Sequence, residues 1–193
     1  MVEFKSLLGI VAIAIGFAGY TIYLRDVISG KAKPHAFSWL IWTILVSIIF
    51  TAQYVNNGAA GSWVTAFTAL FQCVVFSIAI FKGDRKFSKS DWGLLCVALI
   101  SLLSWYATKD PIISVILITL TDFFAFVPTL RKGYTKPWED SVPLWAFTGL
   151  KWCISIIALS SFTFITLLYP VYLFCLGTFY SILLIVRRKN LTR

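Results

Sequence analysis

The sequence predicts an all-α integral membrane protein with seven transmembrane helices, arranged as two parallel three-helix bundles joined by a linker helix. Three observations predict this fold class: apolar blocks long enough to cross a bilayer, lysine and arginine concentrated in alternate loops, and a match between the two halves. Of the 193 residues, 59% are hydrophobic and 13% are charged, whereas a soluble domain has roughly 25% charged residues. A bilayer is therefore the expected solvent.

The apolar blocks are about 16–24 residues long, close to the ~20 residues that a helix needs to cross the hydrocarbon core. Backbone polar groups inside lipid must be paired within the segment, so we expect each block to be helical. The first block follows a short lead and continues into further spans, which favours a transmembrane helix over a cleaved signal. The expected spans are Leu7–Leu24, Phe37–Tyr54, Trp63–Phe81, Trp92–Ala107, Ile112–Leu130, Val142–Ser160 and Thr163–Val186.

The positions of lysine and arginine predict the orientation of these spans. Positively charged loops tend to stay in the cytoplasm, so we expect a multi-pass protein of the cell membrane with its N-terminus outside and its C-terminus in the cytoplasm. An odd number of spans agrees with this. On the expected outer side are only Lys5 and Lys109. The expected cytoplasmic side holds Arg25, Lys31, Lys33, Lys82, Arg85, Lys86, Lys89, Arg131, Lys132, Lys136, Arg187, Arg188, Lys189 and Arg193.

An internal match relates the two halves of the chain at a constant offset of 103 residues. The offset carries the first span onto the fifth, the second onto the sixth and the third onto the seventh, and it leaves the fourth as a linker. We expect a first repeat over 1–81, a loop and linker helix over 82–110, a second repeat over 111–187 and a tail over 188–193. The identities without a gap are Gly30 with Gly133, Lys33 with Lys136, Pro34 with Pro137, Ser38 with Ser141, and Trp42 with Trp145.

This plan, the outer N-terminus and the proline-containing cytoplasmic corners resemble the SWEET and PQ-loop superfamily, in which the chain would be a divergent member. The resemblance implies transport by alternating access, with substrate bound between the repeats. Pro128-Thr129 stands where the family has a Pro-Gln pair. Pro128 and Pro143 match two of four gate prolines of SWEET proteins, and Arg25 and Leu40 stand at the other two. The expected gate or hinge residues are Pro34, Pro128, Pro137 and Pro143.

The same resemblance implies positions for a substrate site. SWEET proteins use a tryptophan in the second helix of each repeat, which Trp42 and Trp145 match, and an asparagine in the third helix. Gln72 and Cys175 stand at the asparagine positions, so a sugar is not the expected substrate.

Two charged residues fall deep inside the expected spans: Asp122 lies nine residues before Arg131, and Lys151 lies nine residues after Val142. At ~1.5 Å per residue, both lie about 13–14 Å from the cytoplasmic edge, near the bilayer midplane. An unpaired charge costs roughly 2.5–3.5 kcal/mol there, so we expect each to be the other's partner. The pair either fastens two spans together or lines a central cavity where a substrate charge or a proton competes for it.

Resemblance to cystinosin-like members of the superfamily implies that Asp122 is a proton-coupling residue. The polar and aromatic groups near its level suit a small polar or zwitterionic solute with a planar part. The expected substrate-binding residues are Trp42, Trp145, Lys151, Gln72 and Gln53.

Several other function classes are disfavoured. Basic residues lie in short loops rather than along one face, so nucleic acid is not an expected partner. No span holds a histidine and no nucleophile–base pair is evident, so an enzyme is not expected. With one histidine and four cysteines without CxxC spacing, neither a metal nor a cofactor is expected.

The expected partners are the bilayer, a small molecule and protons, with an oligomer left open. The alternative function is a receptor or sorting protein that binds a ligand in the same cavity.

Overall fold

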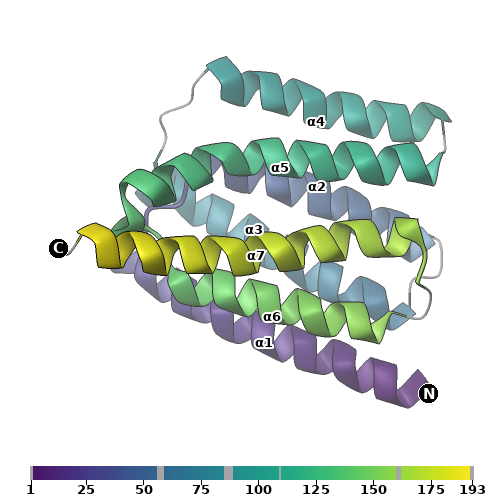
Figure 1. Cartoon of the computed structure of the whole chain (residues 1–193). Helices are drawn as coiled ribbons and strands as arrows, with labels where there is room; N and C mark the ends of the chain where they lie inside the picture. The colour runs from purple at the N-terminus through teal and green to yellow at the C-terminus, as the bar shows by residue number, and fades with distance from the viewer. Residues whose placement is uncertain (1, 56–58, 85–88, 109, 160–161, 192–193) are drawn as a thin grey trace.

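The computed structural model describes residues 2–55, 59–84, 89–108, 110–159 and 162–191, most of them in helices (Figure 1). Within these ranges there is no β-strand, only an isolated bridge between His35 and Asp84. The predicted all-helical class is therefore confirmed. The elements are α1 (Val2–Ile28), α2 (Ala36–Val55), α3 (Ala59–Lys82), α4 (Lys89–Thr108), α5 (Pro111–Thr135), the short 3-10 helix η1 (Pro137–Glu139), α6 (Val142–Ala158) and α7 (Phe164–Leu191).

Each expected span falls on one of these α-helices, and the ends are set by local chemistry. Gly30, with φ of 76°, follows α1 in the left-handed conformation that glycine adopts without strain. Asp110 caps α5 by accepting hydrogen bonds from the backbone N–H groups of Ile112 and Ile113, 2.8 and 3.4 Å away. Ser160, the expected end of the sixth span, lies outside the described residues, as do Arg85, Lys86, Lys109 and Arg193.

Among the described residues, three helices are long and apolar enough to cross a membrane: Glu3–Ile28, Trp63–Lys82 and Phe164–Leu191. Ala36–Thr51 and Val142–Ala158 are apolar but shorter. The chain is thus compatible with a location in a membrane.

The helices lie side by side with their axes roughly aligned (Figure 1). Helix α3 packs against both α1 and α2, and α7 packs against both α5 and α6. Between these groups, α1 packs along α6, and α2 packs against α5. Helix α4 lies at one edge of the bundle, where it contacts α5 and, less extensively, α2 (Figure 1).

Helices α6 and α7 approach each other closely at Gly149 and Gly177. A Cβ added to Gly177 would lie 2.7 Å from the backbone nitrogen of Gly149, and one added to Gly149 would lie 2.8 Å from Oγ1 of Thr178. Small residues at a crossing let two backbones come together, which is how membrane helices often associate.

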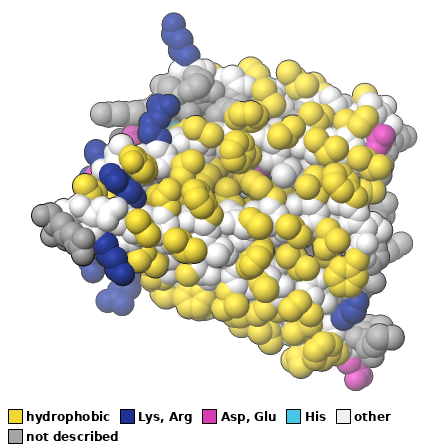
Figure 2. Space-filling view, viewed as in Figure 1, with side chains coloured by type: hydrophobic (Ala, Val, Ile, Leu, Met, Phe, Trp, Pro, Cys, Tyr) yellow, Lys and Arg dark blue, Asp and Glu magenta, His cyan; other side chains and the backbone are white. Residues whose placement is uncertain are grey.

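The surface separates apolar from basic side chains. Figure 2 shows hydrophobic side chains over most of the visible face and most of its Lys and Arg side chains near the end that carries the C-terminus. Many large apolar side chains are exposed, such as Phe17, Leu70 and Phe124, which are 54, 62 and 47% exposed. Apolar exposure on this scale is typical of a surface that faces another apolar medium or a partner.

Candidate functional site

A small cavity lies inside the bundle, with a volume of about 40 Å³. Among the described residues, α4 contributes nothing to its wall, whereas all six other α-helices do. The volume is enough for a few water molecules but not for an organic solute. The lining residues are Tyr20, Trp39, Trp42, Val46, Thr68, Gln72, Asp122, Leu144, Trp145, Thr148, Lys151, Trp152, Tyr169, Leu173 and Leu176.

Lys151 on α6 is almost completely buried, with 1% of its surface exposed. Its ammonium group donates a hydrogen bond of 2.9 Å to Oγ1 of Thr68 on α3. It also lies over the rings of Trp152 and Tyr20, 4.9 and 5.6 Å from their centroids. Gly16 makes room for its aliphatic stem, since a Cβ at that position would lie 2.9 Å from Cδ of Lys151. The ring faces of Trp152 and Tyr20 compensate part of the positive charge of the ammonium group.

Asp122 on α5 is equally buried, with 2% of its surface exposed, and has its own set of partners. Tyr169 and Tyr172, close together on α7, donate hydrogen bonds of 3.0 and 2.8 Å to its two carboxylate oxygens. Hydroxyl donors can stabilise a buried carboxylate without a neighbouring cation.

The expected direct pairing of Asp122 with Lys151 is not found. No ion pair within 4 Å joins these two described residues, whereas Glu139 on η1 forms ion pairs with three lysines. The physical reason is local: each of the two buried charges already has hydrogen-bonding or aromatic neighbours on α1, α3, α6 or α7. Both residues nevertheless line the same cavity.

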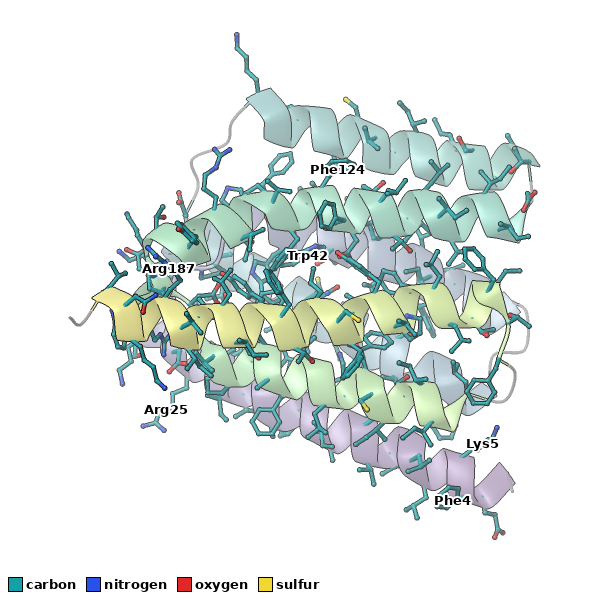
Figure 3. The ribbon with its side chains drawn as sticks, viewed as in Figure 1. Phe4, Lys5, Arg25, Trp42, Phe124 and Arg187 are labelled. Carbon is teal, nitrogen blue, oxygen red and sulfur yellow. The ribbon has the colours of Figure 1, made fainter. Side chains whose placement is uncertain are left out.

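Trp42 and Trp145, the tryptophans matched by the internal repeat, meet at the cavity with ring centroids 6.1 Å apart and planes at 76°. Trp42 lies inside the bundle, as Figure 3 shows. Its indole N–H is buried and has no hydrogen-bond acceptor within the described part of the chain. Oε1 of Gln72, another lining residue, likewise has no donor there. Buried polar atoms are normally paired, so these two are open positions for a ligand or for water.

The remaining expected substrate residue, Gln53, lies near the end of α2, and its side chain is outside the part that the structure describes. Gln72, Trp42, Trp145, Lys151 and Asp122 all border the cavity. Sequence patterns did not single out the partners Thr68, Tyr169 and Tyr172, because threonine and tyrosine occur throughout the apolar blocks.

At the end of the bundle that holds the C-terminus, Asp140 organises a buried cluster that sequence patterns did not reveal. Its Oδ1 accepts hydrogen bonds from the backbone N–H of Ser141 and from the indole of Trp145, at 2.8 and 3.1 Å. Its Oδ2 lies 2.9 Å from the hydroxyl of Tyr180, which lies equally close to the carbonyl of Thr129. Burial raises the pKa of Asp140, although these hydrogen bonds oppose the shift.

This cluster, Asp140 with Trp145, Tyr180 and Thr129, connects α5, α6 and α7 just beyond the cavity. On α7, Arg188 donates to the carbonyl oxygens of Pro137 and Asp140, the latter at 2.6 Å. Gly133 leaves space for Tyr180, because a Cβ there would overlap the hydroxyl. These hydrogen bonds hold α5, η1, α6 and α7 together at this end.

The four expected gate or hinge prolines lie at or near the same end. Pro34 is buried between α1 and α2, and its carbonyl accepts a hydrogen bond of 2.8 Å from the backbone of Asp84. Pro137 begins η1, and Pro143 lies in the first turn of α6. Pro128 lies inside α5, where its missing N–H removes one helical hydrogen bond.

Comparison of the chain with protein-family models, curated proteins and solved structures finds no match. No cluster of three or more potential metal ligands occurs among the described residues.

Proposed function

We propose that the chain is a multi-pass membrane transporter that moves a small polar solute by alternating access to its internal cavity. The observation that carries the proposal is a small internal cavity lined by a lysine and an aspartate, inside a bundle with an apolar exterior. Buried charges of this kind within apolar helices are costly, so they usually serve a ligand, an ion or a proton.

The proposed architecture is seven spans in two three-helix repeats around the linker α4. Three features support it. The third helix of each proposed repeat packs against the first and the second, in α1–α3 and again in α5–α7. The first helix of each repeat packs against the second helix of the other repeat: α1 against α6, and α5 against α2. Helix α4 contributes no described residue to the cavity wall.

Two matched serines support the same repeat at atomic level. Ser38 at the start of α2 donates 2.9 Å to the carbonyl of Ala125 on α5. Ser141, its counterpart at the offset of 103, donates 2.9 Å to the carboxylate of Asp26 on α1. Each serine thus ties the second helix of its own repeat to the first helix of the other. This exchange is the geometry expected of a two-fold relation between the repeats.

The transport cycle that follows from this arrangement alternates the two ends of the bundle. The Asp140 cluster is the closed cytoplasmic gate, and the prolines beside it are its hinges. Asp122 is the proton-coupling residue, because a carboxylate whose partners in the described ranges are tyrosine hydroxyls can take up a proton without breaking an ion pair.

A screen followed by a flux assay tests the proposal. Purified protein is heated with sugars, amino acids, nucleosides, vitamins and organic acids, since a ligand raises the unfolding temperature of the state it binds. Each hit is then tested for counterflow in vesicles that contain the protein. A transporter exchanges the hit across the membrane. Binding without exchange would overturn the proposal and favour a receptor of the same fold.

A further inference from the structure

The cavity contains one cationic group whose hydrogen-bonding capacity is only partly used. An ammonium group has three N–H donors, and Lys151 directs one to Thr68. Its other close neighbours are the ring faces of Tyr20 and Trp152. Aromatic faces attract a cation but do not replace an anion in a medium of low dielectric constant.

Asp122 does not supply that anion. Each of its carboxylate oxygens already accepts a tyrosine hydroxyl, and it lies beyond ion-pair distance of Lys151. Two hydroxyl donors compensate the carboxylate. The ammonium group has one hydrogen-bond acceptor among the residues that the structure describes, so its two other donors remain for something that enters the cavity.

Two further groups of the cavity wall indicate which donors and acceptors a ligand needs. The indole of Trp42 has a donor without an acceptor, and Gln72 has an acceptor without a donor, within the ranges that the structure describes. Both side chains border the cavity, on α2 and α3. A ligand that completes the wall therefore accepts from Lys151 and Trp42 and donates to Gln72.

Flat aromatic surfaces form a large part of the remaining wall. Trp39, Trp42 and Trp145 come from α2 and α6, and Trp39 and Trp42 are themselves 5.4 Å apart between centroids. Rings of this kind bind planar groups through their faces and edges. Because the cavity holds only a few waters, the tryptophans of the two helices must separate to admit such a ligand.

We propose that the cavity binds a planar aromatic carboxylate that carries an N–H or O–H donor on its ring. The carboxylate takes the free donors of Lys151 and Trp42, the ring packs among the tryptophans, and the ring donor pairs with Gln72. This inference rests on the proposed transport function, since it specifies the substrate class of the same cavity.

Matched acids and amides test the ligand class. The probes are 4-hydroxybenzoate and indole-3-carboxylate against their uncharged amides, with 4-hydroxybenzylamine as a cationic probe, in calorimetry of purified full-length protein. The acids are expected to bind at least about tenfold more tightly than the amides, because only the acids carry a negative charge that pairs with the ammonium group of Lys151. Equal binding of acids and amides, tighter binding of the amine, or no binding of either acid would overturn the proposal.

Variants locate the effect within the cavity. Lys151→Met keeps the apolar stem and is expected to abolish the preference for acids, bringing the affinity ratio close to one. Lys5→Met, a charge removed at the opposite end of the bundle from the C-terminus, is the matched control and keeps the ratio. If Lys151→Met does not fold, Trp42→Phe removes the indole donor while keeping an aromatic ring, and it is expected to weaken both acids about tenfold. An unchanged acid preference in folded Lys151→Met, or unchanged affinity for both acids in Trp42→Phe, contradicts the proposal.

Flux measurements separate this inference from the proposed function. Binding of the acids without counterflow contradicts transport but leaves the ligand class intact. Counterflow of another solute, with no binding of the acids, contradicts the ligand class and leaves transport intact.

Discussion

Tyrosine hydroxyls hold two buried carboxylates, Asp122 and Asp140, in the described part of the chain. Tyr169 and Tyr172 hold Asp122, whereas Tyr180 holds Asp140 together with the indole of a tryptophan. All three tyrosines lie on α7. One helix therefore controls hydrogen bonds to both acids, and a movement of α7 changes both environments together.

Replacing Asp122 by asparagine removes the group proposed to take up the proton, while the amide oxygen still accepts from one tyrosine and the amide nitrogen donates to the other. We expect uptake driven by an imposed pH gradient to be lost, whereas counterflow, which needs no driving force, persists. Asp110→Asn on the same helix is the control, because asparagine caps a helix as well as aspartate does. Full pH-driven uptake by the Asp122 variant would exclude proton coupling at this position.

Asp140 offers a test by stability. Asp140→Ala leaves the indole N–H of Trp145 and the backbone N–H of Ser141 short of an acceptor, at an expected cost of about 2–4 kcal/mol, whereas Tyr180 keeps the carbonyl of Thr129. Asp140→Asn keeps an acceptor and is expected to cost much less. Chemical denaturation in detergent measures both. Equal losses in the two variants would mean that the hydrogen bonds of Asp140 do not hold this end closed.

The raised pKa of Asp140 also gives the sign of a pH dependence. Since burial makes the folded protein favour the protonated carboxyl, this group contributes stability that is fully present below its unfolded pKa. The contribution is lost as pH rises through the folded pKa. Asp140→Asn is expected to remove this part of the pH dependence, and a profile identical to that of the native protein would contradict the assignment.

The matched glycines of the repeat have different physical causes. Gly30 follows α1 with a positive φ, whereas Gly133 lies within α5 and makes room for Tyr180. The two glycines match in sequence, but one is needed for its backbone conformation and the other for the space it leaves. The sequence match alone could not reveal these two roles. Asp140 was missed for a similar reason, because it looks like an ordinary loop residue next to Glu139 until the fold buries it.

At the scale of helices, hydropathy located the seven α-helices of the described chain, because uninterrupted apolar blocks of this length favour helices over loops or strands. The structure extends several helices beyond the expected spans, to Ile28 in α1 and Thr135 in α5. These extensions carry polar residues, so hydropathy could not detect them. The sequence predicted that Asp122 and Lys151 lie far from the helix ends, and the structure buries both side chains. Their partners were not evident from sequence, because those side chains come from helices distant in sequence.

The close crossing of α6 and α7 predicts a contrast between two glycines. Gly177→Ala places a methyl group against the backbone of α6 and is expected to destabilise the protein by about 1–3 kcal/mol. Gly93→Ala on α4 meets nothing within 4 Å and is expected to be neutral or stabilising by up to about 1 kcal/mol. Thermal unfolding in detergent compares them. Similar stability in both variants would argue against tight packing at this crossing.

For the whole molecule, the distribution of charge predicts how it sits in the bilayer. Arg25 and Arg187 lie at the end that carries the C-terminus, and Lys5 lies at the opposite end (Figure 3). In a chain whose four cysteines are replaced by alanine, Ser29→Cys is expected to react with an impermeant maleimide only from the cytoplasmic side. Glu3→Cys is expected to react only from outside. The reverse result would invert the proposed orientation.

Access to the cavity from both sides of the membrane is the central claim, and a single cysteine tests it most directly. Thr148 lines the cavity on α6, so Thr148→Cys in the cysteine-free chain reports when the interior is open. The expected result is labelling by an impermeant maleimide in both right-side-out and inside-out vesicles, while Phe124→Cys on the outer apolar face stays unlabelled. Labelling of position 148 from one side only, under all conditions of ligand and pH, would contradict alternating access.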